Sequence, residues 1–160
     1  MGCSGAGKST FCNALLGRVD GAVVSGDVRV NDVPCTFDAF RGVTGFVPQD
    51  DVMLTELTVR ENVTFAAHLK LPVGLGAESK LSKVDELLHE LDILEIADQV
   101  VGSAESGDAG HISGGQRKRV SIALEMVADP VVLFLDEPTS GTRPHRSKSP
   151  RCFGVLRPRA

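Results

Sequence analysis

Four stretches of the chain place apolar residues at the spacing of a helix. Thr58 and Glu61 stand three residues apart, the register of a capping box, just before one of these stretches. Pro72 ends that stretch, because proline cannot continue a helix. The predicted helices cover about residues 8–16, 58–71, 81–91 and 113–126.

Shorter apolar runs predict strands on both sides of the helical block. Val28, Val30 and residues 43–47 form partly alternating runs, interrupted by glycines and an Asn-Asp turn signal. Residues 131–135 follow a proline as an uninterrupted apolar run, typical of a parallel strand buried on both faces. The pattern predicts an α/β domain with a parallel-sheet core and an inserted helical subdomain.

Composition places the chain among globular proteins of one domain. It has 160 residues, 42% of them hydrophobic and 24% charged, and its formal net charge of -4 gives no reason to expect nucleic acid as a partner. Its apolar runs are far shorter than the roughly 20 residues that cross a bilayer. The four cysteines have neither zinc-site nor disulfide-framework spacing, which favours a reduced, cytosolic compartment.

Residues 2–9 match the phosphate-binding pattern G-x-x-x-x-G-K-[ST] in full. Glycines let successive backbone N–H groups point at phosphates, and the following helix adds its positive N-terminal end. Lys8 would contact the β- and γ-phosphates of ATP, and Ser9 would hold Mg²⁺. An ordinary glycine loop is the alternative, and a chance match has a likelihood of about one in two hundred. The predicted phosphate-binding residues are Gly2, Cys3, Ser4, Gly5, Ala6, Gly7, Lys8, Ser9 and Thr10.

Two carboxylates, Asp136 and Glu137, end the apolar run 131–135. In a P-loop protein this is where Mg²⁺ lies, so Asp136 would bind the ion through water. Glu137 would act as the catalytic base that polarises the attacking water. Taken alone, the pair is typical of two solvated acids at a strand end. The phosphate-binding pattern upstream favours the functional interpretation.

Two further motifs resemble those of ABC ATPases. Ile112 and the four residues after it are similar to the family's signature motif, and Gln49 lies in a run similar to its Q-loop. The motifs stand in the family's order and the resemblance covers residues 1–141. It implies a P-loop NTPase fold, ATP and Mg²⁺ as ligands, and a catalytic, Mg²⁺-binding role for Gln49. The implied signature residues, which act on ATP held by a second chain, are Ser113, Gly114, Gly115 and Gln116.

The segments 47–62 and 114–122 resemble the G subfamily of ABC transporters, the White type. This resemblance implies an ATP-hydrolysing domain that powers the export of a lipid-like or hydrophobic substrate. It also implies a head-to-tail dimer with a second ABC ATPase domain, and a transmembrane domain that holds the chain at the cytoplasmic face of a membrane.

The resemblance ends after Gly141. The family continues with a D-loop aspartate and a switch histidine, whereas residues 142–160 hold six Lys/Arg, no acid and three prolines. We expect a partial ATPase domain at 1–141, truncated at both ends, with the Q-loop and helical subdomain at about 50–128. We expect 142–160 to be disordered or out of frame, and a basic arm is the alternative. Alternative functions are a nucleotide-binding module without turnover and an ABC ATPase of translation or DNA repair.

Overall fold

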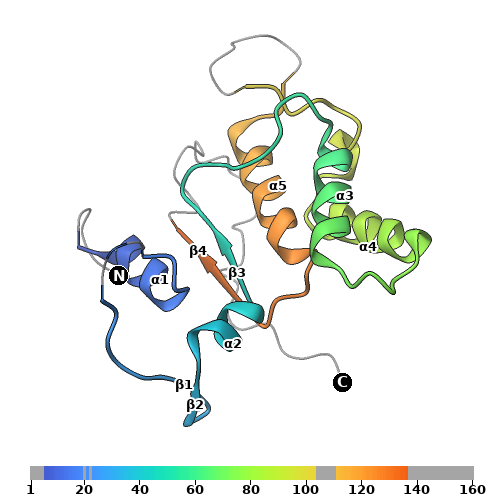
Figure 1. Cartoon of the computed structure of the whole chain (residues 1–160). Coiled ribbons are helices and arrows are strands. Elements are labelled where there is room, and N and C mark those ends of the chain that lie inside the picture. The colour runs from blue at the N-terminus through green and yellow to red at the C-terminus, as the bar shows by residue number, and fades with distance from the viewer. Residues whose placement is uncertain (1–5, 20, 22, 104–110, 137–160) are drawn as a thin grey trace.

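The computed structural model of the chain describes residues 6–19, 21, 23–103 and 111–136 (Figure 1). The helices are α1 (Lys8–Leu15), α2 (Phe37–Gly42), α3 (Val59–Lys70), α4 (Ala77–Glu90) and α5 (Gly114–Met126), with a 3-10 turn, η1, at Leu94–Ile96. The strands are β1 (Val28–Val30), β2 (Val33–Cys35), β3 (Thr44–Val47) and β4 (Val132–Leu135). This architecture is α/β, and all four helices predicted from the apolar pattern are present.

Two small sheets organise the described residues. β1 and β2 form an antiparallel hairpin around Asn31 and Asp32, both with positive φ, as a tight two-residue hairpin turn requires. β3 and β4 pair in parallel, with Gly45 opposite Leu133 and Val47 opposite Leu135. Parallel neighbours need a long crossover, and α3, α4 and α5 lie in the segment that connects these two strands.

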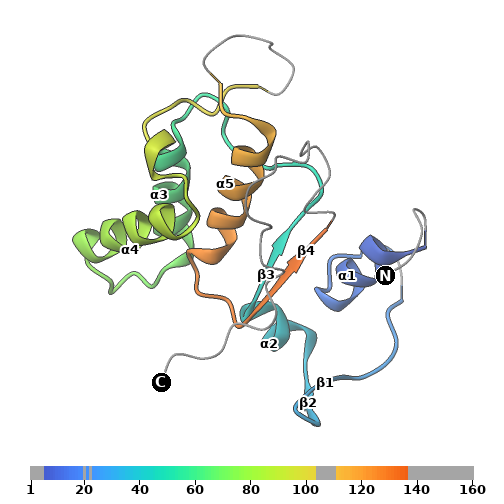
Figure 2. The same cartoon turned by 180° about the vertical axis from the view of Figure 1, so that it is seen from behind.

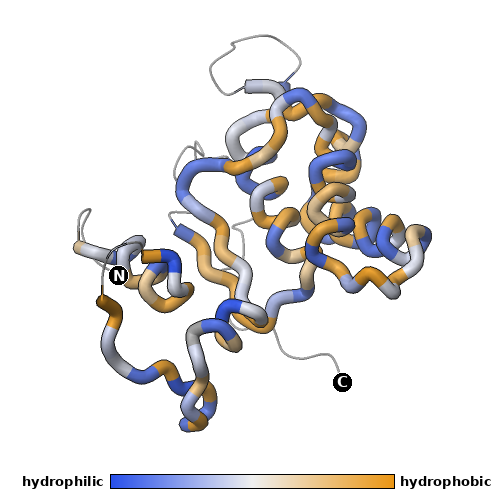
Figure 3. The backbone as a smooth tube through the Cα atoms, viewed as in Figure 1, coloured by the Kyte–Doolittle hydropathy of each residue, from blue (hydrophilic) through white to orange (hydrophobic). Residues whose placement is uncertain are grey.

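The β3–β4 pair separates α1 from the other long helices. Figures 1 and 2 show α1 on one side of the two strands and α3, α4 and α5 on the other. Apolar and polar stretches alternate along the helices, whereas β4 is apolar throughout (Figure 3). The two strands therefore lie between α1 and the helical group of α3, α4 and α5, which are distant in sequence.

The helices α3, α4 and α5 pack around a common apolar core. Its fully buried side chains include Val59, Val63, Val84, Leu88, Val120 and Val127. The capping box predicted at Thr58 and Glu61 is confirmed, and its hydrogen bonds from the Thr58 backbone N–H and hydroxyl lower the pKa of the Glu61 carboxyl. Burial of the apolar faces and a capped first turn together account for this helical group.

The structure differs from the sequence predictions at two points. The strand predicted over 131–135 is present as β4, but its residues are half-buried rather than buried on both faces. The reason is that β3 is its only hydrogen-bonded neighbour among the described residues. The short helix α2, capped by the Thr36 side chain, carries no apolar pattern long enough to predict it. Within the described ranges, no helix is long and apolar enough to cross a membrane.

Candidate functional site

The two parallel strands end side by side and carry two of the predicted site residues to one edge. Gln49 follows β3 by two residues, and Asp136 comes directly after β4. The Asp136 backbone N–H donates to the Val47 carbonyl at 3.0 Å, which extends the strand pairing to Asp136 itself. In α/β proteins, ligands bind outside the carboxyl ends of parallel strands. The fold therefore places Gln49 and Asp136 together where a ligand is expected.

The helix α1 reaches the same edge. Burial raises the pKa of the Cys12 thiol, and the negative charge of Asp136 raises it further, so the carboxylate acts on a residue of α1. The helix begins at Lys8, after Gly7 with φ of 80°, a left-handed conformation that glycine adopts without strain. Ser9 lies in the exposed first turn. A helix start can bind phosphate and a strand-end carboxylate can bind a cation, and the charge of Asp136 reaches α1 at Cys12.

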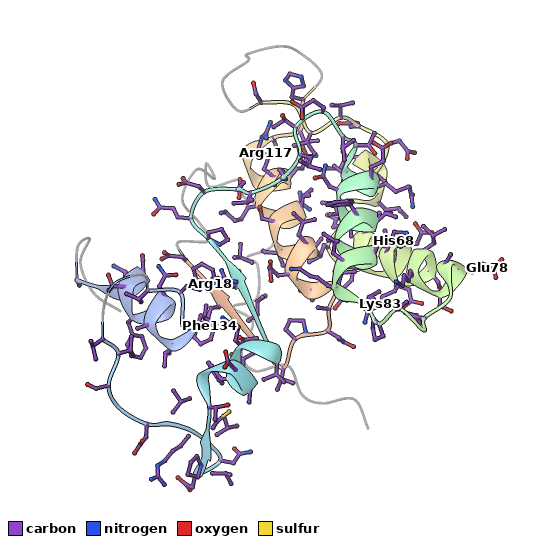
Figure 4. The ribbon with its side chains drawn as sticks, in the orientation of Figure 1. Arg18, His68, Glu78, Lys83, Arg117 and Phe134 are labelled. Atoms are coloured by element: carbon purple, nitrogen blue, oxygen red, sulfur yellow. The ribbon has the colours of Figure 1, made fainter. Side chains whose placement is uncertain are left out.

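Contacts that the sequence did not predict hold α2 and the segment after α1 against the strands. The Arg18 guanidinium lies over the Phe46 ring, 5.2 Å from its centroid, in a cation–π contact. Figure 4 shows Arg18 between α1 and the strands, near Phe134. Phe134 in turn meets Phe40 edge to face with ring centroids 6.1 Å apart. The Arg18 contact joins the segment after α1 to β3, and the Phe40 contact joins α2 to β4.

Five predicted site residues lie outside the described residues. They are Gly2, Cys3, Ser4, Gly5 and Glu137. Of the predicted phosphate-binding loop, the structure describes Ala6 and Gly7 and the start of α1 at Lys8, Ser9 and Thr10.

The predicted signature residues form the start of α5. The Ser113 hydroxyl accepts from the Gln116 backbone N–H at 3.3 Å, and the Gln116 side chain accepts from the Ser113 N–H at 2.7 Å. This capping box leaves Ser113 and Gly114 exposed to solvent. In both views, the start of α5 lies away from α1 (Figures 1 and 2). The fold therefore does not bring the predicted signature residues to α1 of the same chain.

A buried polar cluster joins α5 to the segment after β3, and sequence reasoning missed it. Lys118 contacts the backbone of Gln49 and the side chain of Asp51, and Ser121 donates to the same carboxylate. The only signal in the sequence is the run of three cations at 117–119. Its partners lie about 70 residues away, so the apolar pattern does not reveal the cluster.

The predicted oxygen donors suit Mg²⁺, an ion that protein side chains need not surround completely. Within the described residues, no group of three or more His, Cys, Asp or Glu could hold a metal ion. A hydroxyl at Ser9, an amide at Gln49 and a carboxylate at Asp136 are all oxygen donors. Mg²⁺ prefers oxygen ligands, keeps several waters and is commonly completed by substrate phosphates.

Comparisons with known proteins identify the family of this chain. Residues 1–140 match the family model described as ABC transporter. The chain is 44% identical to ABC transporter G family member 28 of Arabidopsis thaliana and 47% identical to a probable ATP-dependent permease of Saccharomyces cerevisiae, each over 88% of the chain. It is 43% identical to ABC transporter G family member STR of Medicago truncatula, again over 88% of the chain. The matched region spans 12%, 13% and 17% of these three proteins. The chain therefore belongs to the ABC transporter family, as an ATPase domain similar to its G-family members.

Proposed function

We propose that this chain binds Mg-ATP at the carboxyl edge of β3 and β4 and hydrolyses it to drive transport across a membrane. The observation that carries the proposal is that Gln49 and Asp136 follow the ends of two paired strands, with Cys12 of α1 within range of the Asp136 charge. A P-loop ATPase needs these three elements together: a helix start for phosphate, a strand-end carboxylate and a polar group that senses the γ-phosphate.

In this proposal, the phosphates lie against the backbone N–H groups of residues 2–10. Lys8 pairs with the β- and γ-phosphates, and Ser9, Gln49 and Asp136, the last through water, hold Mg²⁺. Bound Mg²⁺ neutralises negative charge on the phosphate oxygens. Glu137 accepts a proton from the water whose oxygen attacks the γ-phosphorus, and the bond to the ADP oxygen breaks.

In this proposal, the signature residues contribute to ATP hydrolysis at the site of a second ATPase domain. Ser113, Gly114, Gly115 and Gln116 act on ATP held by a second ABC ATPase domain in a head-to-tail dimer. The exposure of the start of α5, away from α1, supports this role in trans.

Residues 1–141 are the ATPase domain, and α3, α4 and α5 belong to its helical subdomain at about 50–128. Residues 142–160 are a separate basic tail. A transmembrane domain anchors the chain at the cytoplasmic face of a membrane and exports a lipid-like or hydrophobic substrate. The similarity to G-family transporters supports this assignment.

Nucleotide binding tests the proposal. Lys8→Ala should weaken Mg-ATP binding by about tenfold to a hundredfold, since charge-assisted hydrogen bonds of this kind contribute about 1.5–3 kcal/mol. Calorimetry or fluorescent ATP measures the affinity. Glu137→Gln should bind ATP like the parent, because it keeps the size of the side chain and removes only the proton acceptor.

The matched control is Lys83→Ala, which removes the same charge from a lysine on α4 that pairs with Asp129. Lys83→Ala should leave the ATP affinity unchanged. Equal affinities for the parent and Lys8→Ala would reject the assignment of the phosphate-binding loop.

A further inference from the structure

Three consecutive cations of α5 each donate to backbone carbonyls of a different segment. Arg117 lies in the first turns of α5, facing the loop that precedes the helix (Figure 4). The three acceptor pairs are Val101 and Gly102 for Arg117, Pro48 and Gln49 for Lys118, and Leu91 and Asp92 for Arg119. The middle cation is therefore the one that contacts the segment carrying Gln49.

The ammonium of Lys118 has a full set of acceptors. Its side chain is 7% exposed, and Nζ lies 3.2 Å from the Pro48 carbonyl, 2.9 Å from the Gln49 carbonyl and 2.9 Å from Asp51 Oδ1. Three acceptors match the three donors of an ammonium group. Ser121, three residues further on the same face of α5, donates to the same Asp51 oxygen at 2.9 Å. Four polar contacts thus bind residues 48–51 to one turn of α5.

A buried, paired charge is not in general a large source of stability. Buried ion pairs replaced by apolar side chains of similar volume often lose no stability, because desolvation offsets the attraction. What a fully paired ammonium adds is a fixed position for the groups it binds. Here those groups are the carbonyls of Pro48 and Gln49 and the Asp51 carboxylate. Lys118 itself belongs to the helix that Ser113 caps.

We propose that Lys118 is a positioning residue that fixes Gln49 relative to Asp136 and links Gln49 to the start of α5. The inference rests on the proposed function, in which Gln49 is a ligand of Mg²⁺. The Gln49 side chain is exposed, so its backbone contact with Lys118 limits where the amide can lie. A displacement of Gln49 at the ATP site would reach Ser113 through α5, because Lys118 and Ser113 share that helix.

The test compares Lys118→Met with Lys118→Arg and with Arg119→Met in the full chain. Arg119→Met is the matched control, since it removes the adjacent cation, whose contacts are with the end of α4. Hydrogen exchange measured by mass spectrometry follows the backbone amides of residues 49–52. Titration of Mg²⁺ at fixed ATP follows metal-dependent nucleotide binding.

Lys118→Met should accelerate exchange at residues 49–52. It should also raise the Mg²⁺ concentration at half-saturation by about tenfold, the lower end for loss of a group that orients a metal ligand. ATP affinity without Mg²⁺ should not change. Lys118→Arg should recover part of both effects, and Arg119→Met should produce neither. Parent values for Lys118→Met in both measurements would overturn the proposal.

A second variant covers the case in which Lys118→Met does not fold. Asp51→Asn keeps the lysine and its two carbonyl contacts but removes the charge that holds the ammonium, so it should shift the Mg²⁺ midpoint in the same direction by a smaller factor. An unchanged midpoint would overturn the proposal. If the parent chain bound no ATP, the proposed function would fail. Exchange at residues 49–52 would then decide by itself whether Lys118 fixes this segment.

Discussion

Cys12 and Asp136 come from opposite ends of the described chain, and the charge of one acts on the other. Burial is the larger cause of the raised pKa of the Cys12 thiol, and the Asp136 carboxylate adds to it. A raised pKa keeps the thiol protonated near neutral pH, and the thiolate is the reactive form. Cys12 alkylation therefore reports how α1 lies relative to the end of β4.

Asp136→Asn should make Cys12 react faster with iodoacetamide at mildly alkaline pH. Removing the negative charge stabilises the thiolate, so the pKa of Cys12 falls and its alkylation profile moves to lower pH. The change should be partial, because burial remains. Peptide-resolved mass spectrometry measures the rate at Cys12, with Cys35 on β2 as the internal control. An unchanged Cys12 profile would show that Asp136 does not lie close to α1.

At the scale of elements, the local signals in the sequence identified the long helices. Thr58 and Glu61 are enough to predict where α3 begins, because a capping box is made by residues three apart. α2 has six residues, and so short a helix depends on its tertiary contacts rather than on its own pattern. The paired strands β3 and β4 were each predicted, but their adjacency depends on contacts between distant segments.

In the candidate site too, some residues were predicted from the sequence and others were found only in the structure. Asp136 could be assigned from its place at the end of an apolar run, and Gln49 from its resemblance to the Q-loop. The contact between Ser121 and Asp51 spans 70 residues and follows no motif, so only the folded structure reveals it. The sequence therefore predicts which residues carry chemistry, and the structure adds the residues that hold them in place.

Gly45 is the element-scale position where α5 packs closely on β3. A Cβ built there would lie 2.8 Å from Leu133 Cδ1 and 3.3 Å from both Glu125 Cβ and Pro130 Cγ. Gly45→Val should therefore lower the free energy of unfolding by about 1–3 kcal/mol, the usual effect of overpacking. Gly45→Ala should cost less, since the end of Leu133 can move. Urea denaturation measures the difference.

Gly42→Ala is the control for this prediction. Nothing lies within 4 Å of a Cβ at Gly42, the last residue of α2. Alanine is the better helix former, so this change should not destabilise the protein. If Gly45→Val were as stable as the parent, α5 and β3 would not pack as closely as the structure indicates.

At the scale of the whole molecule, the two groups of residues that the proposed function assigns to ATP binding lie apart. Cys12 of α1 lies within range of the Asp136 charge, and the exposed start of α5 lies away from α1 (Figures 1 and 2). In the proposed head-to-tail dimer, the start of α1 in one copy would face the start of α5 in the other. Such a dimer has two composite sites, each with one contribution from each chain.

Mixing two inactive variants tests whether the sites are composite. Lys8→Ala removes the phosphate contact. Ser113→Asp keeps a side chain that caps α5 equally well but places a negative charge towards the γ-phosphate. Each variant alone should release little phosphate from ATP. An equal mixture should recover about a quarter of the parent rate, because half of its dimers are mixed and each of these has one intact site. Ser113→Asn, which caps the helix without charge, should retain more activity than Ser113→Asp and so separates charge repulsion from loss of the cap. If mixing restored nothing while the parent turned over, Lys8 and Ser113 would have to serve the same site in one chain.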